Sequence, residues 1–422
     1  MAGTLTLVPA LLGLLGDKID WPRKHRYDAA AVVARQQALD HETYHTGFWG
    51  RITRTVMARS ALFVILSVSL LVACVLPYFD LNRGASGIET LPNGDTKTAY
   101  QILSSDFSAG LLAPVEIVID GDLGNAQVQA GITKLQAAIS AEPIFGPTTV
   151  TPNKQGDLAL LETPLKANGT SAAAIDAVWH LRDNLIPAAF GGTHAEVYVS
   201  GGPAFNADYY HIVDASTPIV FAFVLGLSFL LLLAFRSIVV AAKAIIMNLL
   251  SVGAAYGLLV LVFQKGYGHN VFGFQHTPTI ETWVPIFLFC VLFGLSMDYH
   301  VFLLSRIREH YGETRRNGES VAVGLQATGR IITGAALIMV VVFAGFSTGK
   351  LVAFQQMGFG MAVAIFLDAT VVRSLLVPAA MALLGDRNWY LPRWLSWLPT
   401  LHVEGSRPHE AIEPAVEAVG AD

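Results

Sequence analysis

Six apolar runs constrain the fold of this chain more than any other feature of its sequence. Each is close to the roughly 20 apolar residues that an α-helix needs to cross a bilayer. The hydrocarbon core offers no water to backbone N–H and C=O groups, so spans of this kind are helical. The sequence therefore predicts a polytopic α-helical membrane protein with about six transmembrane helices. The runs cover residues 60–79, 217–235, 238–263, 283–304, 331–349 and 359–384.

The charged residues predict how these spans are oriented. Cytoplasmic loops carry an excess of Lys and Arg; eight precede the first span, and five lie between residues 305 and 330. Residues 80–215 instead hold six Lys and Arg against fifteen Asp and Glu. We therefore expect both termini in the cytoplasm and a large extracytoplasmic domain between the first two spans. The net charge is −5 and there is no large basic patch, so no nucleic-acid partner is expected.

The outer region, residues 81–215, has the pattern of a compact α+β domain. Strand-like and helical segments follow one another in the order βαββαβ, which is the ferredoxin-like pattern. The strand-like segments are 115–121, 148–152, 157–165 and 195–201, and the helical ones are 131–141 and 171–185. The two cysteines, Cys74 and Cys290, lie in apolar runs, so the outer region has no disulfide framework or cysteine-based metal site.

The two ends of the chain resemble each other. LVPALLGLLGD (7–17) matches LVPAAMALLGD (376–386) at eight of eleven positions. Duplicated halves are a common plan for transporters. Residues 1–16 are too short to span a bilayer, so we expect them to be the stub of a preceding transmembrane helix. The remaining expected divisions are a cytoplasmic basic linker (17–59), a transmembrane helix (60–80), the outer domain (81–215), a five-helix bundle (216–386) and a largely disordered cytoplasmic tail (387–422).

A carboxyl group and a phenol interrupt the fourth apolar run at Asp298 and Tyr299. Acids inside the membrane cost a few kcal/mol or more, so they commonly mark ion or proton pathways. On a helix, Gly294, Asp298 and Phe302 share one face, and the glycine would let a neighbouring helix approach beside the acid. A desolvated carboxyl group can load and release a proton near neutral pH. The alternative is an acid held by hydrogen bonds for packing alone.

A second acid, Asp368, lies in the last run, and Arg373 follows five residues later. The two form a possible second intramembrane charge pair, either as a structural anchor or as part of proton transfer. His300 points to another side of its helix than Asp298. It is either a pH-sensitive group or a polar residue at a helix interface. Lys243, near the start of the third run, is expected to extend its amine to the membrane surface.

Three segments together resemble the MmpL-type branch of the resistance–nodulation–division (RND) superfamily. They are GLSMDYHVFLLSRIREHY (294–311), GRIITGAALIMVVVFAGF (329–346) and FLDATVVRSLLVPAAMALLGDRNWYLPRW (366–394). The resemblance covers nearly the whole chain and fits the C-terminal half of a family member. It implies proton-driven export of lipids or other hydrophobic molecules across the bacterial inner membrane, through an extracytoplasmic porter domain. It also implies that Asp298 and Tyr299 belong to the proton relay, with Phe302 as a nearby aromatic side chain.

Full members of this family have two such halves. The resemblance therefore implies a separately encoded first half or self-association as a partner, besides membrane lipids and a lipid substrate. No metal, cofactor or enzymatic activity is expected. A membrane protease using Asp298 with Asp368 is one alternative, but neither acid lies in a GxGD motif. The other alternative is an accessory or scaffold subunit, or a remnant, that binds partners through its outer domain.

Overall fold

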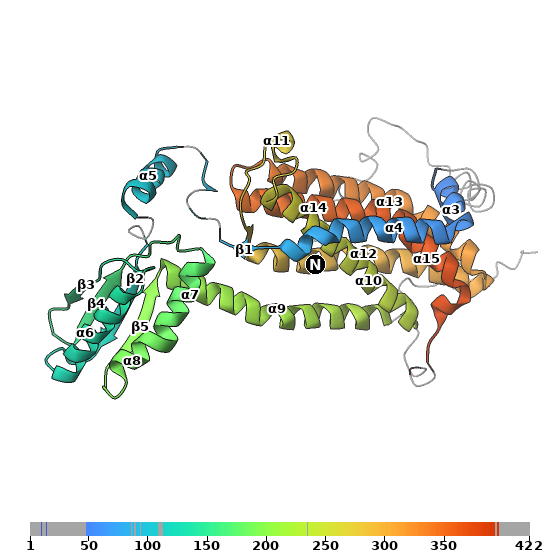
Figure 1. Ribbon diagram of the computed structural model, residues 1–422. Coiled ribbons are helices and arrows are strands. Elements are labelled where there is room, and N and C mark those ends of the chain that lie inside the picture. Colours follow the sequence, from blue (N-terminus) through green and yellow to red (C-terminus); the bar gives the residue numbers. More distant parts are fainter. Residues whose placement is uncertain are drawn as a thin grey trace, which may run out of the picture.

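The computed structural model describes residues 48–392 apart from 86, 88, 89, 93, 109–112 and 234, together with Ala10, Leu14 and Leu395. The expected stub at residues 1–16, most of the linker and most of the tail therefore lie outside the described residues. Within the described part, two bodies of structure are joined by one long helix (Figure 1). One is a helical bundle and the other is a small α/β domain.

The part of the bundle that the structure describes contains six helical stretches long and apolar enough to cross a membrane. Each overlaps one of the six predicted runs, so the prediction of a polytopic membrane protein is confirmed. A short helix, α3 (Phe48–Ala58), precedes them, and α11 (His269–Phe272) lies between the third and fourth. The six are α4 (Ser60–Val75) with η3 (Leu76–Asp80); α9 (Gly202–Leu233); α10 (Ile238–Leu259) with η8 (Val260–Gln264); α12 (Trp283–Thr314); α13 (Asn317–Ser347); and α14 (Val352–Leu367) with η9 (Asp368–Leu376), α15 (Val377–Leu384) and η10 (Gly385–Trp389).

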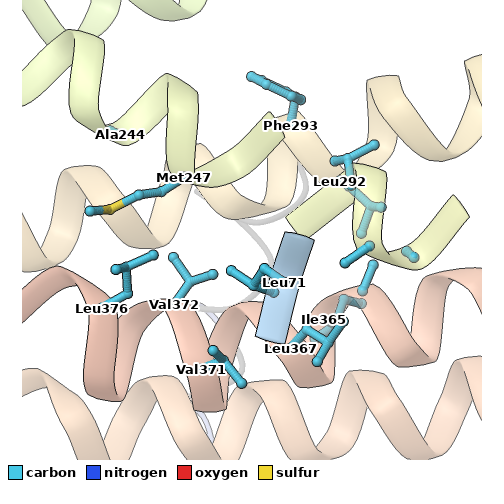
Figure 2. Close-up of a cluster of buried hydrophobic side chains, with 14 of the residues drawn as sticks. Leu71, Ala244, Met247, Leu292, Phe293, Ile365, Leu367, Val371, Val372 and Leu376 are labelled. Carbon is cyan, nitrogen blue, oxygen red and sulfur yellow. The ribbon is translucent and has the colours of Figure 1, made fainter. Parts of the chain in front are cut away.

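The bundle has an inner and an outer set of helices. Most of α10 and of the α14–α15 stretch is buried, whereas α4, α9 and α13 expose most of their apolar surface. Figure 2 shows Leu71 of α4 among side chains from α10, α12 and the α14–η9 stretch. Small residues allow the close packing. A Cβ on Gly257 of α10 would lie 1.9 Å from the carbonyl oxygen of Cys74 in α4, so only glycine fits there.

The outer domain is one antiparallel sheet covered by helices. Along the chain it runs β2 (Val115–Asp120), α6 (Ala126–Ala141), β3 (Thr149–Pro152), β4 (Leu158–Thr163), α7 (Ala172–His180) with η7 (Leu181–Leu185) and α8 (Ile186–Phe190), and β5 (Glu196–Gly201). The strands are ordered β3-β4-β2-β5. Residues at every second position of β2 are buried because alternate side chains face the helices. Ile117 pairs with Leu161 on one side and Val199 on the other, and Leu135 and Leu181 complete a core separate from that of the bundle.

Helix α9 begins directly after β5 and connects the two bodies without a break. Ala204 and Ala207 in its first turns belong to the core of the outer domain, whereas Leu232 near its end belongs to the core of the bundle. Figure 1 shows this helix running from the sheet along the bundle. A two-stranded parallel pairing of β1 (Arg83–Gly84) with β6 (Ile280–Glu281) lies at the same end of the bundle as the outer domain. Helix α5 (Asp95–Leu103) and η5 (Ser104–Ser108) precede the sheet.

Candidate functional site

Helix α12 carries polar groups on two opposite sides. Gly294 and Asp298 are exposed on one side, and Ser296 and His300 are buried on the other. Among the described residues Asp298 has no hydrogen bond or ion pair, and a Cβ on Gly294 would meet nothing within 4 Å. In this chain by itself, Asp298 is therefore exposed, and the close approach of a neighbouring helix beside it stays a prediction. The helices that pack on α12, chiefly α13 and α14 with α9 and α10, cover its other sides.

Tyr299 does not face the same side as Asp298. Its hydroxyl donates to Met339 Sδ of α13 at 3.6 Å, and the guanidinium of Arg373 lies 4.8 Å from the centre of its ring. This cation–π contact ties α12 to the last span. Phe302 is partly buried and lines a cavity of about 1410 Å³ between α3, α12 and α13. Of the predicted relay residues, Tyr299 lies beside Arg373, whereas the neighbouring Asp298 makes no hydrogen bond or ion pair among the described residues.

Asp368 and Arg373 form a buried ion pair. Oδ2 of Asp368 accepts from Arg373 Nη2 at 2.6 Å and from Nε at 3.0 Å, and the two residues are 9% and 2% exposed. They lie in η9, which is a π-helix. Five residues along an α-helix turn the side chain about 140° away. The wider π turn, with its i→i+5 bonding, brings positions five apart to one side.

Ser296 joins this ion pair to two further helices. Its hydroxyl lies 2.8 Å from Asn248 Oδ1 of α10 and 3.1 Å from Asp368 Oδ2. Its carbonyl oxygen accepts from Arg373 Nη2 at 2.9 Å and from His300 Nδ1 at 3.1 Å. We refer to Asn248, Ser296, His300, Asp368 and Arg373 as the buried polar cluster.

The buried polar cluster has unused hydrogen-bonding capacity. Asp368 Oδ1, Arg373 Nη1, Asn248 Nδ2 and His300 Nε2 are buried without a partner among the described residues. Three of these side chains, with Ser296 and Tyr299, line a cavity that gives the centre of a water molecule about 20 Å³. That is enough for a water, and several polar partners surround it. The arrangement suits proton exchange between oxygen and nitrogen atoms in a dry interior.

Comparison with known proteins assigns the chain to a group. The family model described as "MMPL family" matches residues 95–402. The chain belongs to the MMPL family. This MMPL chain is 36% identical to the mycolic acid-containing lipids exporter MmpL11 of Mycolicibacterium smegmatis, over 96% of its own length and 42% of the relative. It is 28% identical to the trehalose monomycolate exporter MmpL3 of the same organism, over 93% of its length and 41% of the relative.

A third relative carries another name. The heme uptake protein MmpL11 of Mycobacterium tuberculosis H37Rv is 34% identical over 97% of this chain and 42% of the relative. The MMPL chain therefore spans about two fifths of the length of these relatives, and it corresponds to their C-terminal half. The predicted resemblance to MmpL-type transporters of the RND superfamily is confirmed.

The polar residues that the MMPL chain brings together are not the set expected from the sequence. Asn248 and Ser296 were not among the predicted site residues, because single Asn and Ser side chains inside apolar runs give no distinctive signal. Lys243 Nζ donates to Asn388 Oδ1 of η10, which follows the last span, at 3.2 Å. Asp298 and Asp368 share no hydrogen bond, so they do not form the two-carboxylate dyad of an aspartyl protease. No group of three His, Cys, Asp or Glu in the described parts could hold a metal.

Proposed function

We propose that this chain is the second half of an MmpL-type transporter that exports lipids or other hydrophobic, amphiphilic small molecules across the bacterial inner membrane. The proton motive force drives the export. Family membership supports the transporter class, and the names of two relatives as lipid exporters support the substrate class. The chain covers less than half of each of those relatives, so transport by the whole assembly is part of the proposal.

The observation that carries the proposal is the position of Asp298. Its carboxyl group lies within an apolar helix of 32 residues, on a face that no described helix covers. An acid exposed to hydrocarbon is costly and is normally paired inside a bundle or a water-filled path. We therefore assign Asp298 and Tyr299 to the proton relay, with Gly294 and Phe302 beside them and the Asp368–Arg373 pair as its second charged part. Each proton moving down the membrane potential supplies about 2.3 kcal/mol per 100 mV.

The same face implies a partner. Gly294 and Asp298 offer a flat, partly polar strip on which another helix can pack closely. We propose that a separately encoded first-half protein or a second copy of this chain covers it. The α/β domain with strand order β3-β4-β2-β5 is proposed to be the ferredoxin-like porter domain, residues 81–215, outside the membrane. Both termini and the Arg-rich end of α12 are then cytoplasmic.

Proton-dependent export in proteoliposomes tests this function. The chain is reconstituted alone and with a first-half protein, a pH gradient is imposed, and movement of a labelled lipid is followed. Asp298→Asn removes the titratable group while keeping its shape. Glu313→Gln, at the exposed end of the same helix, is the matched control. Export that needs the gradient, survives Glu313→Gln and stops in Asp298→Asn supports the proposal. Export that continues in Asp298→Asn, or none in either reconstitution, refutes it in favour of an accessory subunit.

A further inference from the structure

His300 is the member of the buried polar cluster that lies farthest along α12 toward the Arg-rich end of the bundle. It is 2% exposed. Its Nδ1 lies 3.1 Å from the Ser296 carbonyl oxygen and 3.4 Å from the Ser296 hydroxyl. A carbonyl oxygen only accepts, so in the neutral ring Nδ1 carries the hydrogen and Nε2 is a free base. That Nε2 atom is buried and has no partner within the described structure.

The charged groups that face His300 come from two other elements. Asp368 and Arg373 lie on η9 and Lys243 lies on α10, and the charges of all three act on the imidazole. Ser296 of α12 is hydrogen-bonded to Asn248 of α10. His300 comes four residues after Ser296, about 6 Å toward the C-terminal end of α12. Lys243 comes five residues before Asn248, about 7.5 Å toward the N-terminal end of α10. The two helices run in opposite chain directions, so both displacements point to the same end of the bundle.

Polar contacts continue from Lys243 to that end. Lys243 Nζ donates to Asn388 Oδ1 at 3.2 Å, and Asn388 belongs to η10, which follows the last span. Arg308, near the end of α12, donates to the carbonyl oxygen of Phe235 just before α10, which places the ends of these helices together. On the buried side of α12, the positions after His300 are Leu303, Leu304 and Ile307. His300 is therefore the last buried polar side chain of α12 between the cluster and this end.

We propose that His300 is the proton carrier between the Asp368–Arg373 pair and the cytoplasm, passing protons toward Lys243 and Asn388. Ser296 Oγ, which lies within reach of both Asp368 Oδ2 and His300 Nδ1, links the acid to the ring. In each passage Nδ1 gains a proton from Ser296 Oγ, which takes one from Asp368, and Nε2 releases one on the cytoplasmic side. The Nδ1–H ring described above is the state after this release, and the ring returns to the Nε2–H tautomer before the next passage, so the imidazole is neutral before and after. The inference rests on the proposed proton-driven function and assigns its cytoplasmic exit.

Proton uptake by pyranine-loaded proteoliposomes, in the reconstitution that transports, tests this role. His300→Gln keeps hydrogen bonding but cannot titrate, so proton flux is expected to fall by about 100-fold. His300→Ala leaves room for a free base, and added imidazole is expected to restore flux in this variant alone. Thr328→Val is the matched control, because that buried hydroxyl on α13 bonds only within its own helix, to the Gly324 carbonyl at 2.7 Å.

The outcomes separate the two proposals. Loss in His300→Gln with imidazole rescue of His300→Ala supports the carrier role, since a residue needed only for packing is not replaced by a diffusing base. Wild-type flux in His300→Gln, with flux abolished in Asp298→Asn, overturns the carrier role and leaves the transport function standing. Loss without rescue, in a variant whose melting temperature matches the wild type, also overturns it. Absence of proton flux in the unmodified protein overturns both.

Discussion

Asp368 receives two hydrogen bonds from Arg373, and both end on the same oxygen atom, Oδ2, at 2.6 and 3.0 Å. The other oxygen, Oδ1, is buried without a partner among the described residues. The pair is therefore neutralised but not fully hydrogen-bonded. Its two members depend on each other strongly, because either one alone would be an uncompensated charge in a dry interior.

Asp368→Ala is expected to destabilise the chain by about 3–5 kcal/mol, since Arg373 is then a buried cation without its counter-charge. The double variant Asp368→Ala with Arg373→Met is expected to recover most of that loss, because it removes both charges. Melting temperatures of the purified protein in detergent measure both effects. A double variant no more stable than Asp368→Ala would show that the pair does not act as a unit.

Gly257→Ala is expected to destabilise the bundle by about 1–3 kcal/mol. The added Cβ would overlap the backbone oxygen of Cys74 at 1.9 Å, so α4 and α10 must separate. Gly294→Ala serves as the control, because its Cβ would meet nothing within 4 Å and alanine favours the helix. Thermal unfolding of the two variants should rank Gly257→Ala clearly below Gly294→Ala; equal melting temperatures would contradict the close packing.

A cysteine at Gly294 is expected to cross-link to a partner in membranes, in a background where Cys74 and Cys290 are replaced by alanine. Gly226→Cys on α9 is the control, since this position is also exposed and open but has no acid beside it. Oxidation followed by gel electrophoresis detects the product. Efficient cross-linking of Gly294→Cys, without cross-linking of Gly226→Cys, identifies the Gly294 face of α12 as the surface that contacts the partner. Equal cross-linking of the two variants would indicate random collision.

Leu161→Ala is expected to cost about 2–5 kcal/mol in the outer domain, because Leu161 is fully buried at the centre of the sheet. Tyr198→Ala on the edge strand β5 is the control, as Tyr198 is 56% exposed. Resistance to limited proteolysis reports on the domain within the intact chain. Rapid cleavage in Leu161→Ala with unchanged cleavage in Tyr198→Ala is the expected result, and the reverse order would contradict the assigned core.

Much of the fold could be predicted from the sequence, because its signals are local. Span length and apolarity predicted the six candidate membrane helices, and strand periodicity located β2 through β5 within a few residues. Helix α9 was predicted to start at 217, but it begins at Gly202. Its first turns pack on the outer domain through Ala204 and Ala207. They also hold polar residues such as Asn206 and Asp208, so hydropathy alone does not include them in the span.

The site was harder to predict, since it depends on which helix faces which. If the last span were α-helical throughout, the side chains of Asp368 and Arg373 would point about 140° apart around the helix axis. The π turn of η9 brings them to the same side. The exposure of Asp298 depends on the absence of a covering helix among the described residues, and no pattern within α12 encodes that. The roles of Asn248 and Ser296 follow from contacts between spans rather than from spacing.

Helix α9 gives the molecule a lever arm. At 32 residues it is about 48 Å long, with one end anchored in the core of the bundle and the other in the core of the outer domain. A tilt of about 5° at the membrane end displaces the far end by roughly 4 Å. Small repacking around α9 inside the bundle is therefore magnified into a larger displacement of the α/β domain at the other end of the helix.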